Sequence, residues 1–153
     1  MYKVMSATLT EILRKLGLYL RAKLVIALVM SVLTYLGLRL IGVEYSAPLA
    51  LMTGFLDLIP VVGPLLALVV SAGVALATGN FTKALLVVLF YLLLQQVEAW
   101  ILEPRLLGGA VGLNPWLTLA ALVLASIFFG PLGALLAIPA LIVVTVIYTQ
   151  TKK

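Results

Sequence analysis

Four long apolar stretches limit what this chain can fold into, because together they occupy most of its length. Of its residues, 65% are hydrophobic and only 10% are charged, and the mean hydropathy is +1.29. A soluble domain is roughly half apolar and about a quarter charged, so this chain would expose too much apolar surface to water. One membrane crossing takes about 20 residues, which leaves room for a few crossings. The composition therefore predicts an all-α polytopic integral membrane protein.

The basic residues predict how the chain is oriented in the membrane. Five of the ten Lys and Arg residues precede the first apolar stretch, and two close the chain. Positive charge beside membrane segments marks the cytoplasmic side, so we expect both termini in the cytoplasm and the lipid bilayer, not nucleic acid, as the partner. Apolar residues recur at helical spacing at Ile12, Leu16, Leu20 and Leu24. They predict that residues 1–23 form an amphipathic helix at the cytoplasmic surface.

The first predicted membrane unit, residues 24–78, combines a span with an overlong apolar stretch. As a helix, residues 24–42 would be about 28 Å long, enough for one crossing of a hydrocarbon core about 30 Å thick. Residues 47–78 would form a helix of about 48 Å, too long for one upright crossing and too short for two. This second stretch must therefore tilt strongly or break.

A break is predicted at the run that holds Pro60, Gly63 and Pro64. A proline inside a helix costs about 3 kcal/mol and removes a backbone donor. We therefore expect two half-helices, residues 47–59 and residues 65–78, joined at membrane depth.

The second predicted unit has the same order of a span and a broken stretch. Residues 82–102 can span, and the Glu103-Pro104 pair is expected to end this helix. Residues 117–149 are again too long for one crossing and are interrupted at Gly130 and Gly133. Pro139 predicts a further kink. The predicted parts of the chain are residues 1–23, 24–78, 82–149 and a basic tail, 150–153.

The two units are candidate inverted repeats, and their breaks share lettering, with GPLLAL at 63–68 beside GPLGAL at 130–135. If each broken stretch turns back on itself as a re-entrant hairpin, each unit crosses the membrane an odd number of times, and the second unit is inverted relative to the first. Paired interrupted helices in inverted repeats are typical of a transporter site near the membrane midplane. The alternatives are single kinked spans, and small residues that only allow close helix packing.

Four polar side chains stand in otherwise apolar segments. Asp57 precedes the first break, and Gln95 and Glu98 share one helix face with Gln96 beside them. A carboxylate at the membrane centre costs about 2.5–3.5 kcal/mol, which makes Asp57 and Glu98 candidates for a proton or cation switch. Asp57 could instead accept a hydrogen bond from the substrate, lie at an interface or cap the break. Glu98 could instead clamp a neighbouring helix or pair with Arg105.

The breaks themselves predict polar backbone groups at membrane depth. Irregular backbone there must be buried in protein or line a wet cavity. The N–H groups that follow Pro64 and Pro131 could hold an anionic or strongly polar group. The predicted substrate or ion pathway consists of Asp57, Pro60, Gly63, Pro64, Gln95, Gln96, Glu98, Gly130 and Gly133.

Enzymatic chemistry is not predicted. The chain has no histidine and no cysteine, which removes the commonest metal ligand, the usual proton shuttle and the thiol nucleophile. None of the glycines is followed by the Gly-Lys-Ser/Thr of a phosphate-binding loop. We therefore expect no enzyme activity, no metal and no cofactor.

Three groups of residues, in this order, resemble the autoinducer-2 exporter family, the PerM-like permeases. The first is residues 54–64 (GFLDLIPVVGP), the second is QQVE at 95–98 with PRLLG at 104–108 and GLNP at 112–115, and the third is residues 129–139 (FGPLGALLAIP). The loop and packing residues of this pattern are Pro104, Arg105, Gly108, Gly112, Asn114, Pro115 and Pro139.

The resemblance implies a bacterial inner-membrane permease whose relatives are linked to export of autoinducer-2 and some to cation/proton antiport. It covers the C-terminal half of a usual member. We therefore expect a homo-oligomeric transporter of a small polar solute, exporting it or exchanging it for protons or monovalent cations. The alternative is a non-transporting oligomeric membrane assembly module or an excised fragment of a larger permease.

Overall fold

The computed structural model describes residues 2–107 and 112–151, and this part of the protein consists of helices joined by short turns. Three helical runs are long and apolar enough to cross a membrane, namely Ala7–Ile41, Phe81–Leu106 and Trp116–Thr149. These runs confirm the predicted all-α polytopic membrane protein. The chain forms two compact units: one is Leu24–Pro104, and the other combines Met1–Lys23 with Arg105–Lys153.

Helix α1, Tyr2–Ile41, is continuous across the predicted junction between residues 23 and 24. It ends at Gly42, whose φ of 79° is the left-handed conformation that glycine adopts without strain. The N–H of Val43 donates to the carbonyl oxygen of Leu38 at 2.9 Å, which satisfies a carbonyl of the last turn. A glycine cap therefore determines where α1 ends.

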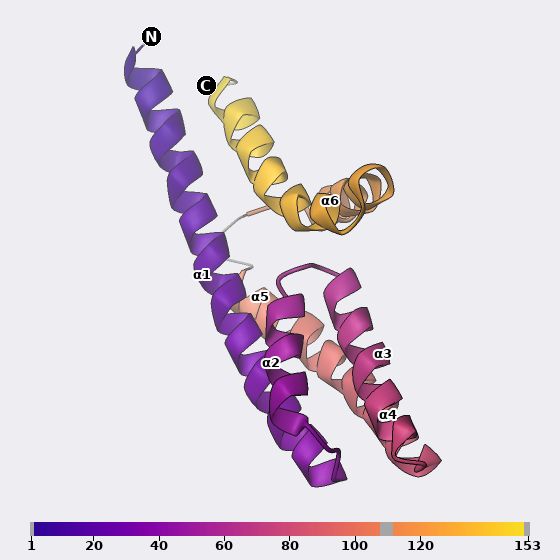
Figure 1. The fold of residues 1–153 in the computed structure, drawn as a ribbon. Helices are drawn as coiled ribbons and strands as arrows, with labels where there is room; N and C mark the ends of the chain where they lie inside the picture. Colours follow the sequence, from indigo (N-terminus) through magenta and orange to yellow (C-terminus); the bar gives the residue numbers. More distant parts are fainter. Residues whose placement is uncertain (1, 108–111, 152–153) are drawn as a thin grey trace. The chain divides into compact units, whose positions relative to one another are not determined.

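Within the unit Leu24–Pro104, three further helices follow α1 and fold back and forth (Figure 1). They are α2 (Ser46–Leu56), α3 (Val62–Ala77) and α4 (Phe81–Val97). Short turns join α2 to α3 and α3 to α4, and both pairs pack together, so α2 and α4 run in the same direction. The side chain of Asn80 accepts a hydrogen bond from the N–H of Lys83 at 2.9 Å and caps the start of α4.

Small residues bring α1 and α2 close together in this unit. The Ser31 hydroxyl donates to the carbonyl oxygen of Ala50 at 2.9 Å. One turn further along, a Cβ added to Gly54 would lie 2.9 Å from the carbonyl oxygen of Ala27. Small residues four apart on both helices are typical of helix contacts in membranes.

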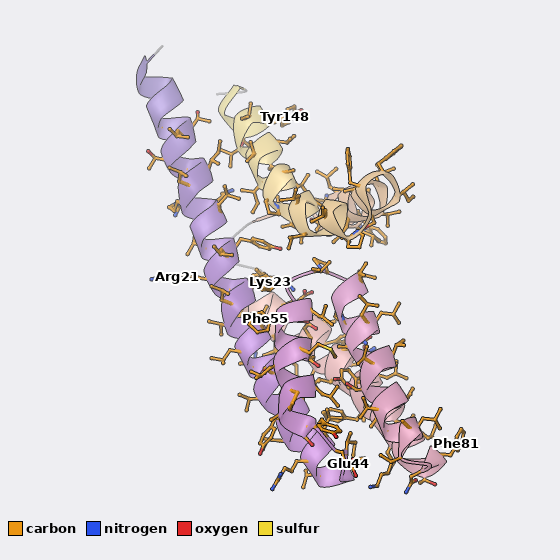
Figure 2. All side chains as sticks on the ribbon, viewed as in Figure 1. Arg21, Lys23, Glu44, Phe55, Phe81 and Tyr148 are labelled. Atoms are coloured by element: carbon orange, nitrogen blue, oxygen red, sulfur yellow. The ribbon has the colours of Figure 1, made fainter. Side chains whose placement is uncertain are left out.

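Large apolar side chains cover the outside of the same unit. Phe55 and Phe81 are 74% and 72% exposed, and Phe81 extends away from the helices in Figure 2. The core is made by Leu38, Val43, Leu49, Ala67, Ala75, Ala84, Val87 and Tyr91. A large exposed apolar surface is what a protein surrounded by lipid requires.

Pro104 does not end the helical run that begins at Phe81, contrary to the prediction from the Glu103-Pro104 pair. The run continues through a π-helix, Glu98–Leu102, into a short helix α5, Glu103–Leu106. Because the ring of Pro104 clashes with the carbonyl four residues earlier, an α-helix cannot pass this point unchanged. The wider π-helical turn, in which the Glu103 N–H bonds the Glu98 carbonyl, comes directly before it.

In the other unit, helix α6 runs over Pro115–Thr151 and changes direction at Gly130 (Figure 1). Gly130 has φ 62° and ψ −146°, which are not helical, whereas Pro139 remains within the helix. Tyr19 of α1 packs on Ile142 and Val146 of α6. The structure thus has the predicted break at Gly130, and Pro139 lies inside the helical arm that follows it.

Candidate functional site

The first break is a tight turn between α2 and α3, from Asp57 to Val61. The Asp57 N–H donates to the carbonyl oxygen of Thr53 at 2.9 Å and ends α2. The Gly63 N–H donates to the Ile59 carbonyl oxygen at 2.9 Å. The turn is therefore held by its own backbone bonds.

Gly63 allows α2 and α3 to meet at this turn. It is buried, and a Cβ added to it would overlap the carbonyl group of Leu56, the last residue of α2. The sequence identified Gly63 as part of the break. The structure adds the reason: the position has no room for any side chain.

The N–H groups at the start of α3 already have carbonyl partners. Those of Val62, Gly63 and Leu65 donate to carbonyl oxygens within the turn at 2.7, 2.9 and 3.4 Å, and Pro64 has no N–H. An anionic group at this helix end would have to displace these bonds. Any polar ligand at the first break therefore depends on side chains more than on the helix N-terminus.

Val61 is strained at the tip of the turn. Its φ of 67° and ψ of −54° place a β-branched residue in a γ-turn, closed by the Val62 N–H on the Pro60 carbonyl oxygen at 2.7 Å. Such a conformation costs about 1–3 kcal/mol. The side chain is exposed, so packing does not explain the choice of valine.

Replacing Val61 with glycine should therefore raise stability. Glycine removes the strain but costs about 0.5–1 kcal/mol in unfolded-chain entropy, which leaves a net gain of about 1 kcal/mol. Thermal unfolding in detergent measures the change. The matched variant Val62→Gly lies in α3 and should lose about 1 kcal/mol, and equal effects in both variants would contradict strain at Val61.

Asp57 and Glu98 are both buried inside the unit Leu24–Pro104. They are 1% and 7% exposed, although both belong to a unit with an apolar core. Asp57 caps the C-terminus of α2, and Glu98 is the first residue of the π-helix after α4. Both therefore occupy irregular backbone next to a helix end, where π-helical turns and breaks are frequent at functional positions.

Four hydroxyl groups from four helices meet in the same unit, and the sequence did not single them out. They belong to Thr34 of α1, Thr53 of α2, Ser71 of α3 and Tyr91 of α4, and each is at most 2% exposed. The Tyr91 hydroxyl lies 2.7 Å from Thr53 Oγ1 and 2.8 Å from Ser71 Oγ. Thr34 Oγ1 lies near the Tyr91 hydroxyl but makes no hydrogen bond of standard geometry among the described residues. We call these four residues the hydroxyl cluster.

Helical spacing could have found part of this cluster. Thr53 precedes Asp57 by one turn on α2, and Tyr91 precedes Glu98 by about two turns on α4, so each hydroxyl shares a helix face with a carboxyl. Polar residues at such spacing in an apolar helix mark an inward face. No carboxyl lies within two turns of Thr34 on α1 or of Ser71 on α3, so only the packing of the helices brings these two hydroxyls to Tyr91.

The remaining predicted residues are spread over the chain. Gln95 is half-buried and Gln96 is exposed, whereas Pro60 and Pro64 are half-buried at the first break. Pro104, Arg105, Gly112 and Asn114 are exposed; Asn114 Oδ1 accepts a hydrogen bond from the Trp116 N–H at 2.9 Å, beside Pro115 at the start of α6. Gly108 lies outside the described residues.

The second break repeats the close approach seen at the first. Gly133 is buried, and a Cβ added to it would overlap the carbonyl group of Ala125, on the arm of α6 before the change of direction at Gly130. By geometry, Gly133 therefore corresponds to Gly63, although the lettering of the sequence pairs Gly63 with Gly130. The two breaks lie in different compact units.

Buried carboxyls beside a broken helix, among apolar helices, are typical of the substrate and ion pathways of membrane transporters. The whole chain, residues 1–153, matches the family described as AI-2E family transporter. The chain belongs to this family, and it is a multi-pass membrane protein.

Individual relatives agree with this family. "Putative transport protein YdbI" of Bacillus subtilis is 31% identical over 140 residues, which are 92% of this chain and 40% of the relative. "AI-2 transport protein TqsA" of Escherichia coli is 32% identical over 133 residues, which are 87% of this chain and 39% of the relative. The chain thus spans about two fifths of the length of these relatives.

Proposed function

We propose that this chain moves a small polar solute across the bacterial inner membrane, by export or by exchange coupled to protons or monovalent cations. The observation that carries the proposal is the burial of Asp57 and Glu98 inside an apolar helical unit. Because burying a carboxylate in an apolar unit is costly, buried acids in membrane helices mark positions where protonation or cation binding is part of the function. The family and the name of TqsA support a transporter and suggest AI-2 as a solute to test.

The proposed orientation and assembly rest on the positions of the basic residues, the helix lengths and the exposed apolar surface. Both termini lie in the cytoplasm in this proposal, because the basic residues gather at the two ends of the apolar region. The α2–α3 pair is a re-entrant hairpin, since neither helix is long enough to cross. Homo-oligomers are the proposed form, because the exposed apolar surface accepts other subunits as well as lipid.

The proposal is tested with the purified chain in proteoliposomes. With a pH gradient imposed, AI-2 efflux should exceed that of protein-free vesicles, and imposing or collapsing the gradient should change its rate at least about threefold. Solute flux is followed by mass spectrometry and internal pH by a trapped fluorescent dye. Flux equal to that of protein-free vesicles, for AI-2 and for a panel of small polar solutes and cations, would contradict transport by this chain.

A second candidate function is a non-transporting assembly module. It is favoured by the hydroxyl cluster, since hydroxyl groups between membrane helices also clamp them together. In that case the chain forms a stable oligomer, seen by native mass spectrometry, but adds no flux.

A further inference from the structure

The hydroxyl cluster has one internally consistent order of hydrogen bonds. The Thr53 hydroxyl donates to the carbonyl oxygen of Leu49 at 2.8 Å, so its single proton is used there. The 2.7 Å contact with Tyr91 is then a bond that Tyr91 donates and Thr53 accepts. The 2.8 Å contact with Ser71 must in turn be a bond that Ser71 donates to Tyr91.

This order links three helices through one atom. The Tyr91 hydroxyl oxygen of α4 is bonded to Thr53 of α2 and to Ser71 of α3, the two arms of the hairpin at the first break. The chain of donors ends on a backbone carbonyl, so it has no titratable terminus. The cluster is therefore a connection between helices and not a path for protons.

These hydrogen bonds fix the position of α2 and α3 along the axis of α4, which apolar packing alone would not determine. Apolar side chains permit small sliding between helices, whereas a hydrogen bond of 2.7 Å fails within a few tenths of an ångström. Tyr91 is held from the side by the ring of Phe90, at 5.8 Å between centroids and an interplanar angle of 77°. The Phe90 ring in turn lies against Gly37 of α1.

The two carboxyls lie on the same side of this connection. Since α2 and α4 run in the same direction, Asp57 lies about 6 Å beyond Thr53 along α2, and Glu98 lies about 10 Å beyond Tyr91 along α4. Their levels thus differ by about one helical turn. Any slip of the hairpin against α4 would change that offset directly.

We propose that Tyr91 is a positioning residue for the carboxyl pair: through Thr53 and Ser71 it sets the axial register of the hairpin against α4, and hence the separation of Asp57 and Glu98. That this pair couples transport to protons or cations rests on the proposed function. The positioning itself does not, because it concerns two buried acids in a defined register.

The test measures proton uptake by the pair without measuring transport. Dicyclohexylcarbodiimide modifies protonated carboxyls in apolar surroundings, and mass spectrometry of the modified peptides gives labelling against pH for each acid. In Tyr91→Phe and in Thr53→Val, the labelling midpoint of at least one acid should move by about half a pH unit or more. Thr53→Ser keeps the hydroxyl and should restore the wild-type midpoint.

Tyr35→Phe is the matched control, because Tyr35 lies on α1 of the same unit but is exposed. It should leave both midpoints unchanged. Thr53→Val serves as the second variant if Tyr91→Phe yields no folded protein. Unchanged midpoints in folded Tyr91→Phe or folded Thr53→Val would overturn the proposal, and so would a wild-type pair that takes no label at any pH.

The failures of the two proposals are distinguishable. If the midpoints move but the wild-type chain gives no flux, positioning stands and transport by this chain fails. If flux is present and the variants keep the wild-type midpoints, transport stands and positioning fails.

Discussion

Replacing Gly63 with alanine should destabilise the protein by about 3 kcal/mol or more, one of the largest effects of any single methyl group in this chain. The added Cβ would overlap the carbonyl group of Leu56, and backbone cannot yield as a flexible side chain can. The turn from Asp57 to Val61 would have to open, and α2 would separate from α3. Thermal unfolding of the detergent-solubilised protein measures the loss.

Gly73→Ala is the control for this prediction. Gly73 lies in the middle of α3, and a Cβ added there meets nothing within 4 Å. Because alanine is the better helix former, this variant should be unchanged or more stable by up to about 1 kcal/mol. If both variants lost stability equally, general intolerance of α3 to alanine, and not the close approach at Gly63, would be the cause.

The sequence predicted much of the fold because the length of an apolar stretch and the positions of its proline and glycine residues determine where a helix can continue. The stretch 47–78 could not be one upright span, and Pro60, Gly63 and Pro64 lie where α2 gives way to α3. By contrast, Pro104 was expected to end a helix. The π-helical turn from Glu98 to Leu102 absorbs the missing hydrogen bond and the ring clash, and such a turn has no simple sequence signal.

The two breaks show that similar sequence does not place equivalent residues in equivalent roles. The repeated letters align Gly63 with Gly130, yet Gly130 provides a positive φ while Gly133 provides the close approach. At the first break these tasks fall to Val61 and Gly63. Backbone geometry is set by how the two arms meet, and this differs by a residue between the breaks.

The sequence predicted only those residues of the candidate site whose side chain is unusual in an apolar helix. A carboxyl in an apolar helix stands out, so Asp57 and Glu98 were found, and both are buried. A single threonine or serine in such a helix does not stand out, because it can satisfy its hydroxyl on its own helix. Thr34 and Ser71 become candidate site residues only because they lie next to the Tyr91 hydroxyl, and that proximity depends on the packing of four helices.

Neutralising the buried carboxyls should remove proton or cation coupling while leaving the fold in place. In Asp57→Asn and in Glu98→Gln, the side chain keeps its shape but can no longer take up and release a proton. We expect the part of the solute flux that depends on the pH gradient to fall about tenfold or more in each variant. Proteoliposome flux, measured with the gradient imposed and with it collapsed, gives this part by difference.

Glu44→Gln is the matched control, because Glu44 is exposed in the turn between α1 and α2 at the edge of the unit (Figure 2). It removes the same charge without touching the buried pair, so gradient-dependent flux should remain at the wild-type level. Wild-type coupling in a folded Asp57→Asn or Glu98→Gln variant would remove that residue from the mechanism, whereas loss of coupling in Glu44→Gln as well would point to net charge as the cause.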